Sequence, residues 1–432
     1  MNRIIGKYLK NRATISPWAI AGMGRSDFSA AIIIPALAER ESLPLTLDRL
    51  SLNSVECLAQ TLIIVVVNNR LDVSPAKFVD NQNTLRWLES IPYPQLNLIW
   101  IDASSKGLEI PAGDGVGLAR KIGFDAALQT LDWKVDPLLI SLDGDTLVDR
   151  NYLSTIFDHF SAGENRSAVI PFHHQFSPFP EQEAAIRHYE LYLRSYLFGL
   201  TMAGSPYAFH SIGSAFACRA DAYIKAGGMN RRCGGEDFYF LQQLAKTSVV
   251  KTLVGTVVHP SPRFSQRVPF GTGKAVQEQV EKGIALFHFV PVGGFKILKE
   301  WLELINVRVN SSADQIHRYT LDISSILYQF LTELNFVQTW GKLQKNYPAE
   351  KQRLAAFHHW FDALRTRQLL TRIEVESPSA EKVVAELLNW GEVGWIEDGA
   401  EQLKLLERLQ GVNGHSPDIP GTQGIAARAT PR

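Results

Sequence analysis

Four short and almost wholly apolar runs lie in the first third of the chain, separated by polar or helix-like stretches. They occupy residues 31–36, 61–69, 96–104 and 138–143. Between the first two runs, Leu recurs every three or four positions, which is typical of an amphipathic helix. Continuous apolar strands that alternate with helices indicate a mainly parallel sheet with helices on both faces. The pattern predicts an α/β fold, whose ligands bind beyond the carboxyl ends of the strands.

The pattern changes from about residue 165. Two strand-like stretches, SAVIPFHH and AFHSIGSAFACRA, flank an aromatic helix whose Tyr and Leu face indicates a core or a dimer contact. A homodimer is therefore left open. Residues 295–410 show apolar positions at helical spacing only, which predicts a helical C-terminal extension. The last twenty or so residues are small, polar and rich in Pro and Gly, and we expect them to be disordered.

Composition excludes several classes of protein. Among 432 residues, 44 Lys and Arg balance 44 Asp and Glu, so no nucleic-acid partner is expected. No apolar stretch approaches the ~18 residues of a membrane helix, and the first residues lack a signal-peptide core. The three cysteines have the spacing of neither a disulfide framework nor a zinc site. We expect a cytoplasmic protein, and peripheral association with the inner face of the membrane is left open.

The fourth apolar run ends in Asp143-Gly144-Asp145. In extended chain, residues i and i+2 point to the same side, so the two carboxylates can converge on one point. Like charges this close repel unless a cation lies between them. Mg²⁺ and Mn²⁺ prefer carboxylate oxygens as ligands, so the pair is a candidate metal site. The alternative is a solvated acidic turn that binds no metal. A calcium EF-hand is excluded, because its sixth and twelfth loop positions would be Val148 and Ser154.

Two glycine-rich stretches precede helix-like segments. In GDGVGLAR, Gly117 and its neighbours open a helix that carries Arg120, and a glycine-rich helix start can bind a phosphate. A solvated helix face is the alternative for Arg120. In CGGEDFYF, Glu236 and Asp237 begin a second helix. Acidic residues stabilise a helix start, but a carboxylate held there can also act as a general base.

A basic stretch follows at residues 258–275. His259 ends a short strand, and Arg263 and Arg267 lie in a loop with glycine hinges that reaches Lys274. A histidine in such a place is either structural or a ligand of Mn²⁺. A basic loop with glycines can close over a diphosphate and exclude water.

The ordered set of motifs resembles glycosyltransferase family 2 of the GT-A fold over residues ~30–275. IIIPALAERESLP is similar to the first strand and loop of that family, LARKIGFDAAL to its Ala-Arg-Asn helix, and GSAFACRADAYIKAGGM with GGEDFYFLQQL to its acceptor strand and Glu-Asp element. One departure concerns the second strand, where Asn68 and Asn69 replace the paired aspartates of the family. The identity of the nucleotide stays open for this reason.

The resemblance implies a hexosyltransferase-type enzyme (EC 2.4) with a nucleotide-diphosphate sugar as donor. Its acceptor hydroxyl would belong to a saccharide, a lipid-linked sugar or a small molecule. Asp143 and Asp145 would hold Mn²⁺ or Mg²⁺ with the diphosphate, and Asp237 would be the base. The nucleotide would be held by residues 35–39, which include Pro35, Ala36 and Glu39, and by Asn68 and Asn69.

The same resemblance divides the chain into functional segments. We expect an N-terminal extension at 1–29, a nucleotide-sugar-binding half at 30–164 and an acceptor half with the catalytic helix and basic loop at 165–294. A helical domain at 295–410 and a tail at 411–432 follow.

Three alternatives remain beside metal-dependent transfer with inversion. In a retaining GT-A transferase, Asp237 would position the acceptor and His259 would bind the metal. A nucleotidyltransferase would use a similar metal and nucleotide site. A non-catalytic nucleotide-sugar-binding protein would need neither Asp237 nor the metal pair.

Overall fold

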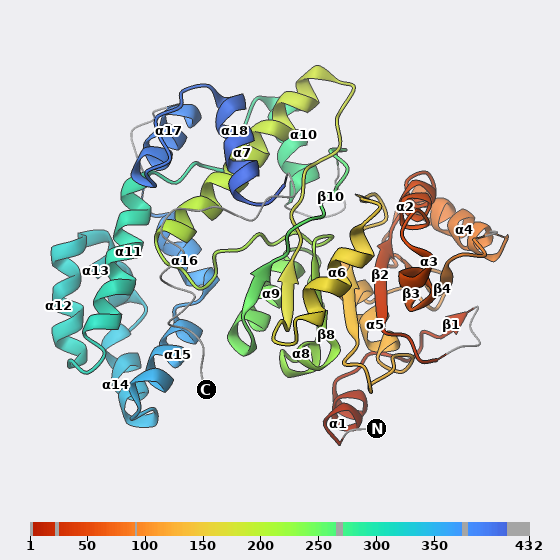
Figure 1. Ribbon diagram of the computed structural model, residues 1–432, viewed down its shortest axis with the longest axis horizontal. Helices are drawn as coiled ribbons and strands as arrows, with labels where there is room; N and C mark the ends of the chain where they lie inside the picture. Colours follow the sequence, from red (N-terminus) through yellow and green to blue (C-terminus); the bar gives the residue numbers. More distant parts are fainter. Residues whose placement is uncertain (1–2, 22–25, 91–92, 265–270, 374–378, 413–432) are drawn as a thin grey trace. The chain divides into compact units, whose positions relative to one another are not determined.

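The computed structural model describes residues 3–21, 26–90, 93–264, 271–373 and 379–412, which form two compact units. The α/β unit comprises the described parts of residues 1–186, 211–284 and 411–416. The helical unit comprises residues 187–210 and the described parts of 285–410. Figure 1 labels most elements of both units. Helix α7 (Pro180–Met202) begins in the first unit and continues in the second, so the helical unit is built from two stretches of the chain.

Within the described chain, an eight-stranded sheet forms the centre of the α/β unit (Figure 1). The strand order is β1-β4-β3-β2-β5-β8-β7-β9. Strand β2 pairs in parallel with β3 on one side and β5 on the other, and β3 pairs in parallel with β4. Every residue of β2 and β3 is buried, which explains their unbroken apolar sequences. The four predicted strands are β2 (Ala30–Ala36), β3 (Thr61–Asn68), β4 (Asn97–Ala103) and β5 (Leu138–Ser141).

Antiparallel strands extend the sheet beyond this parallel centre. Strand β8 (Phe216–Arg219) pairs with β5, and β7 (Ser167–Val169) pairs with β8. Strands β1 (Ile20–Ala21) and β9 (Val250–Thr252) lie at the two edges. A separate small sheet joins β6 (Leu147–Val148) to β10 (Val258–His259). Strands β1, β6 and β9 were not predicted, because their two or three residues carry little alternation, whereas the equally short β7 and β10 lie in stretches that were predicted as strands.

Helix α5 (Val116–Ala127) is the buried helix of this unit, and it packs on β2 and β3. A Cβ atom at Gly123 would lie 2.6 Å from the Ile33 side chain, so the glycine permits this close packing. The predicted α/β class, with a mainly parallel sheet flanked by helices, is confirmed. The other helices of this unit are α1 (Arg3–Asn11), α2 (Leu43–Leu50), α3 (Val55–Ala59), α4 (Pro75–Ser90), α6 (Tyr152–Ser161), α8 (Ala220–Lys225), α9 (Glu236–Thr247) and α10 (Thr272–Lys282).

The N-terminal segment docks on α5 through one buried carboxylate. Asp125 is fully buried and accepts hydrogen bonds from the Tyr8 hydroxyl at 2.8 Å and from the Thr14 N–H at 2.7 Å. The Tyr223 hydroxyl donates to the same carboxylate at 2.9 Å, and Lys121 Nζ lies 2.8 Å from it. A buried carboxylate needs such partners to offset its lost hydration. Asp125 therefore ties residues 8–14 to the α/β unit.

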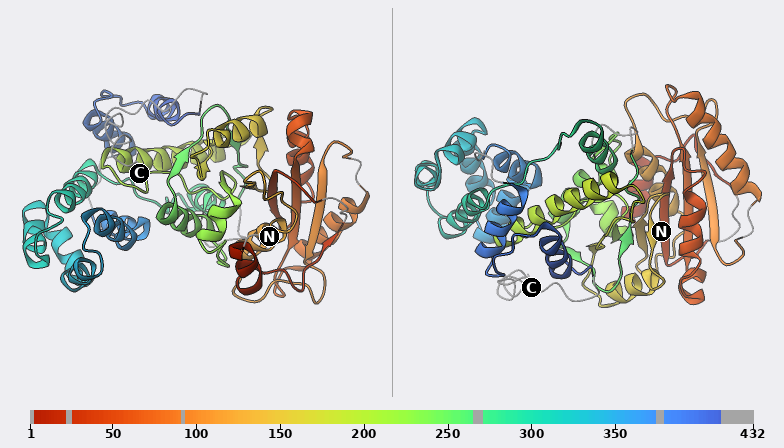
Figure 2. Two further views of the ribbon diagram at one scale, coloured as in Figure 1. Left: turned by 60° about the horizontal axis from the view of Figure 1, so that its bottom comes forward. Right: turned by 90° about the horizontal axis from the view of Figure 1, so that it is seen from above.

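The predicted helical C-terminal extension is confirmed, and its helices run from teal to blue in Figure 2. Trp301 and Trp340 are fully buried in its core. Two stretches that read as continuous helical patterns are interrupted, because Ser324 and Asp362 cap new helices with their side chains. The helices are α11 (Val292–Val307), α12 (Ala313–Ile323), α13 (Ser325–Glu333), α14 (Phe336–Asn346), α15 (Glu350–Trp360), α16 (Ala363–Leu370), α17 (Ala380–Trp390) and α18 (Gly399–Leu409).

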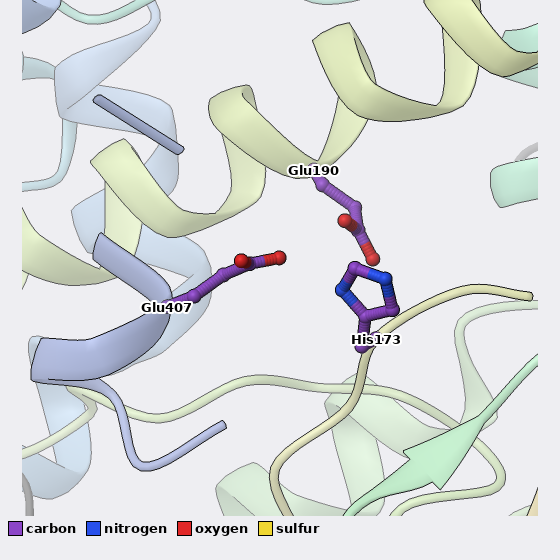
Figure 3. Close-up of side chains that lie close together, drawn as sticks. All are labelled: His173, Glu190 and Glu407. Carbon is purple, nitrogen blue, oxygen red and sulfur yellow. The ribbon is translucent and has the colours of Figure 1, made fainter. Parts of the chain in front are cut away.

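A buried ionic cluster joins α7 to α18 within the helical unit. Glu190 projects from α7 and Glu407 from α18 (Figure 3). Arg194 Nη2 lies 3.9 Å from Glu190 Oε1 and 3.9 Å from Glu407 Oε1. The side-chain amide of Gln410 also donates to the Arg194 carbonyl at 2.9 Å. Burial lowers the pKa of Arg194, and the two carboxylates oppose that shift.

Across the described residues, none of the helices has the length and apolar character needed to cross a bilayer.

Two glycines of the helical unit should respond in opposite ways to replacement by alanine. A Cβ atom at Gly199 in α7 would lie 2.3 Å from the buried ring of Phe295, so Gly199→Ala should lower the free energy of unfolding by about 1–3 kcal/mol. A Cβ atom at Gly341 in α14 would meet nothing within 4 Å, so Gly341→Ala should raise it by up to about 1 kcal/mol. Urea unfolding measures both, and a stabilised Gly199→Ala would contradict the packing described here.

Candidate functional site

The D-G-D motif lies in the loop that directly follows β5, at the carboxyl edge of the parallel strands. The Thr46 hydroxyl donates to the Gly144 carbonyl at 3.1 Å and holds the loop from α2. A Cβ atom at Gly144 would lie 3.1 Å from Glu39 Cγ, so a larger residue would crowd Glu39. The side chains of Asp143 and Asp145 are 33% and 17% exposed, respectively. Both carboxylates are therefore fixed in place and still reach solvent.

Arg120 of α5 is the central cation of the site. It is only 2% exposed, and its Nη2 lies 2.5 Å from Asp143 Oδ1. Its Nε lies 3.0 Å from Glu236 Oε1, and its Nη1 donates to the Ser141 hydroxyl at 2.7 Å. Burial lowers the pKa of Arg120, but the charges of Asp143 and Glu236 outweigh it and raise the pKa above its ordinary value. Arg120 thus joins the D-G-D loop to the start of α9.

Gly213 leaves the space that the Arg120 side chain occupies. A Cβ atom at Gly213 would lie 2.4 Å from Arg120 Nη2 and 3.6 Å from Asp237 Oδ2. Asp237 therefore lies beside the same guanidinium group. The Gly213 carbonyl also accepts a hydrogen bond from the Ser141 hydroxyl at 2.7 Å. Sequence reasoning missed Gly213 and Ser141, since a glycine before a strand and a serine inside one have no distinctive spacing.

The two acidic residues at the start of α9 have different environments. Gly235 precedes them in the left-handed conformation, with φ of 66°, which glycine adopts without strain. Burial raises the pKa of Glu236, and Arg120 opposes this shift. Burial and the charge of Glu236 raise the pKa of Asp237 to about 8, although the Phe238 N–H donates to Asp237 Oδ1 at 2.7 Å. Asp237 therefore holds its proton more strongly than an ordinary aspartate does.

Arg263 is the second cation of the site. Its Nη2 lies 2.7 Å from Asp145 Oδ2 and pairs with the Glu39 carboxylate, and its Nη1 donates to the Ser42 hydroxyl at 3.2 Å. Burial lowers the pKa of Arg263, but the charges of Asp145 and Glu39 raise it overall. Arg263 thus joins the D-G-D loop to the segment after β2. Arg267 lies outside the described residues.

The end of the basic stretch, which we expected to be a loop as far as Lys274, is helical in the described residues. Helix α10 begins at Thr272, directly after its N-cap Gly271. Lys274 lies in the first turn of this helix and pairs with Glu278. A glycine-rich stretch with one lysine has no apolar periodicity, so the pattern alone could not identify this helix start.

The glycines before α5 allow close packing between two backbone segments. The Gly117 N–H, which we predicted to face a phosphate, donates to the Arg232 carbonyl at 3.0 Å. A Cβ atom at Gly117 would lie 2.7 Å from that oxygen, and one at Gly115 would lie 2.4 Å from Cys233 Cα. The start of α5 is therefore held against the segment that leads into α9. This contact brings Arg120 to Glu236.

The residues expected to hold the nucleotide lie at the ends of β2 and β3. Pro35 and Ala36 are the last residues of β2 and are buried. Asn69 Oδ1 accepts from the Asn81 amide at 2.7 Å, and Asn69 Nδ2 donates to the Ser104 carbonyl at 3.3 Å. Among the described residues, the buried Oδ1 of Asn68 has no hydrogen-bond partner. The two asparagines therefore differ, and the Asn69 amide is already engaged by the protein.

His259 lies on β10, opposite Leu147 of β6. Its Nε2 is 3.1 Å from Asp149 Oδ1, and its Nδ1 is 3.1 Å from the His173 carbonyl oxygen. The hydrogen bond from His259 is the main reason that the pKa of Asp149 lies below its ordinary range. Both ring nitrogens thus face oxygen acceptors. Either nitrogen would have to leave its present partner in order to bind a metal.

No family model and no curated protein matches this chain. Solved structures with a similar fold include S. aureus TarS 1–349 in complex with UDP-GlcNAc, at 12% identity and a TM-score of 0.40, covering 89% of this chain and 91% of that one. The mannosyltransferase PcManGT from Pyrobaculum calidifontis, in complex with GDP-Man and Mn²⁺, matches at 14% identity and a TM-score of 0.36, covering 85% and 88%. Similarities this low assign no activity to the chain.

The raised pKa of Asp237 predicts that Asp237→Asn stabilises the ligand-free protein at neutral and higher pH. An unfolded Asp ionises near pH 4, whereas folded Asp237 keeps its proton to about pH 8, so wild-type stability falls between these values. Asparagine has no proton to lose. We expect the variant to be more stable than wild type by at least about 1 kcal/mol at pH 8, the worth of roughly one pKa unit, and by much less at pH 5.

Urea unfolding at both pH values measures this difference. An effect of equal size at pH 5 and pH 8 would show that Asp237 is not desolvated in the folded state.

Proposed function

We propose that this chain is a metal-dependent glycosyltransferase that moves a sugar from a nucleotide-diphosphate sugar to an acceptor hydroxyl with inversion. The observation that carries the proposal is the bridge made by Arg120, which binds Asp143 on one side and Glu236 on the other. A pair of metal-binding carboxylates and a general base have to lie close together if both act on one sugar. The bridge supports that arrangement.

The charge of the site fits a hard divalent cation. Five carboxylates, from Glu39, Asp143, Asp145, Glu236 and Asp237, surround the guanidinium groups of Arg120 and Arg263. Even with Asp237 protonated, the other four carboxylates outnumber the two arginine cations. Carboxylate oxygens are the ligands that Mg²⁺ and Mn²⁺ prefer. Asp143 and Asp145 would hold the ion. A bound ion would neutralise the charge that develops on the leaving diphosphate.

Asp237 is the proposed general base. Glu236 is held by Arg120, which leaves Asp237 as the carboxylate of this pair with a pKa suited to proton transfer. A base works best when its pKa lies near the working pH, and about 8 meets this condition. Asp237 would take the proton of the acceptor hydroxyl as the new glycosidic bond forms. Glu236 would then serve to position Arg120.

Arg263 is proposed to bind the diphosphate. It contacts Asp145 and Glu39 in the ligand-free protein, and a guanidinium group can exchange a carboxylate partner for a phosphate oxygen. Arg267 is a further candidate for this role, whereas the Gly117 N–H at the start of α5 already donates to the Arg232 carbonyl. The nucleotide would lie against Pro35, Ala36, Asn68 and Asn69.

The retaining alternative assigns His259 to the metal. The hydrogen bonds of His259 to Asp149 and to the His173 carbonyl favour a structural role instead, and therefore favour inversion. Analysis of the product anomer separates the two mechanisms. Release of pyrophosphate from a nucleoside triphosphate would identify a nucleotidyltransferase.

Asp145→Asn should abolish the Mn²⁺-dependent part of donor binding while the protein stays folded. The donors to test first are UDP-GlcNAc and GDP-Man, which the similar solved structures bind. Titration calorimetry with and without Mn²⁺ measures the metal-dependent part, and the metal-free titration of the same variant is the control. Unchanged metal-dependent affinity would remove Asp145 from the metal site.

Asp237→Asn should lower the turnover rate by ~10²–10⁴-fold and leave the donor dissociation constant nearly unchanged, because asparagine cannot accept the proton. Asp221→Asn is the matched control, since Asp221 also lies in the first turn of a helix, α8, where it pairs with Lys225. A helix-capping role would affect the two variants alike. Turnover above about a tenth of wild type in Asp237→Asn would favour the retaining mechanism.

A further inference from the structure

A pocket of about 340 Å³ lies beside the D-G-D loop within the α/β unit. Its volume falls in the range of about 300–1,000 Å³ that is typical of small-ligand sites. Part of its wall comes from residues 147–149, which begin two positions after Asp145. The polar and aromatic side chains around it are those of Arg49, Asp149, His173, His174, Gln175, Phe176 and His259.

The pocket is attached to the D-G-D loop by Gln175. The side-chain amide of Gln175 donates to the Asp145 carbonyl at 2.9 Å and to the His259 carbonyl at 2.8 Å. The Gln175 N–H donates to the Pro260 carbonyl at 2.9 Å. These bonds join three segments of the wall to one another. A ligand in the pocket is therefore held at a fixed distance from the D-G-D loop.

The charges of the wall are mixed. Asp149 pairs with His259 at 3.1 Å, and the positive charge of Arg49 also acts on Asp149. The carboxylate disfavours a strongly anionic ligand, and the polar groups of the wall disfavour a purely apolar one. Hydrogen-bond donors and acceptors both line the space. The wall therefore suits a neutral ligand with many hydroxyl groups.

Phe176 adds an aromatic face to this polar wall. It is 74% exposed, so its ring is open to a ligand. Sugar rings present apolar C–H groups on one face and hydroxyls at their edges. An exposed aromatic ring beside polar groups matches both features.

We propose that this pocket binds a neutral saccharide. This assignment rests on the glycosyl transfer proposed above: the saccharide is part of the acceptor. It would be a sugar residue of the acceptor that binds beside the D-G-D loop, at a distance from the hydroxyl that reacts. The acceptor is then a carbohydrate chain or carries one.

The test uses saturation-transfer NMR of the full chain with four neutral disaccharides: cellobiose, maltose, lactose and N,N′-diacetylchitobiose. At least one should bind to wild type without any donor present. Phe176→Ala should weaken that binding by about tenfold or more. Phe179→Ala is the matched control, because Phe179 is also exposed, at 67%, but does not line the pocket. It should bind as wild type does.

Three outcomes would overturn the assignment: no binding of any of the four disaccharides, equal weakening by both substitutions, or displacement of the disaccharide by millimolar inorganic phosphate. The last would identify an anion site at Arg49. Titration with the donor is a separate measurement. Saccharide binding that depends on Phe176, in a protein that binds no nucleotide sugar with Mn²⁺, would reject glycosyl transfer and keep the saccharide pocket.

Discussion

The buried guanidinium group of Arg120 is the constraint on which the site depends. A cation that is 2% exposed loses most of its hydration, and the loss is offset only by good geometry with opposite charges. Asp143 and Glu236 provide those charges from two segments that are 93 positions apart in the chain. Removing either partner would leave Arg120 with one carboxylate instead of two, so the D-G-D loop and the start of α9 are energetically coupled.

The packing of α5 makes this coupling possible. Gly115 and Gly117 let the start of α5 contact the backbone of residues 230–233, and Gly213 leaves space for the arginine side chain. Small residues at close backbone contacts thus determine where a charged side chain can lie. Like Arg120, Arg263 pairs with two carboxylates from different segments of the chain, because it joins Asp145 of the D-G-D loop to Glu39. Two cations therefore hold the loop from two directions.

Buried polar groups also anchor segments that the α/β sheet does not hold. Asp125 binds the N-terminal residues to α5 and α8, and Arg194 joins α7 to α18 in the helical unit. Each of these groups has to find its partners in order to be buried, and only one arrangement of the neighbouring elements supplies them. Such contacts specify position more than they add stability.

The sequence alone determined the α/β class, the four parallel strands, the helical C-terminal extension and the residues of the two acidic motifs. These features follow from local patterns, because buried strands must be apolar throughout and glycines and carboxylates gather where strands and helices meet. Only the tertiary structure decided which of these groups are neighbours. In the folded chain, Arg120 pairs with Asp143 and Glu236, and His259 pairs with Asp149. The Gly117 N–H donates to a backbone carbonyl. The reason is physical: a residue type and its spacing set the chemistry a side chain can do, but partners distant in the chain decide its charge, its burial and its pKa.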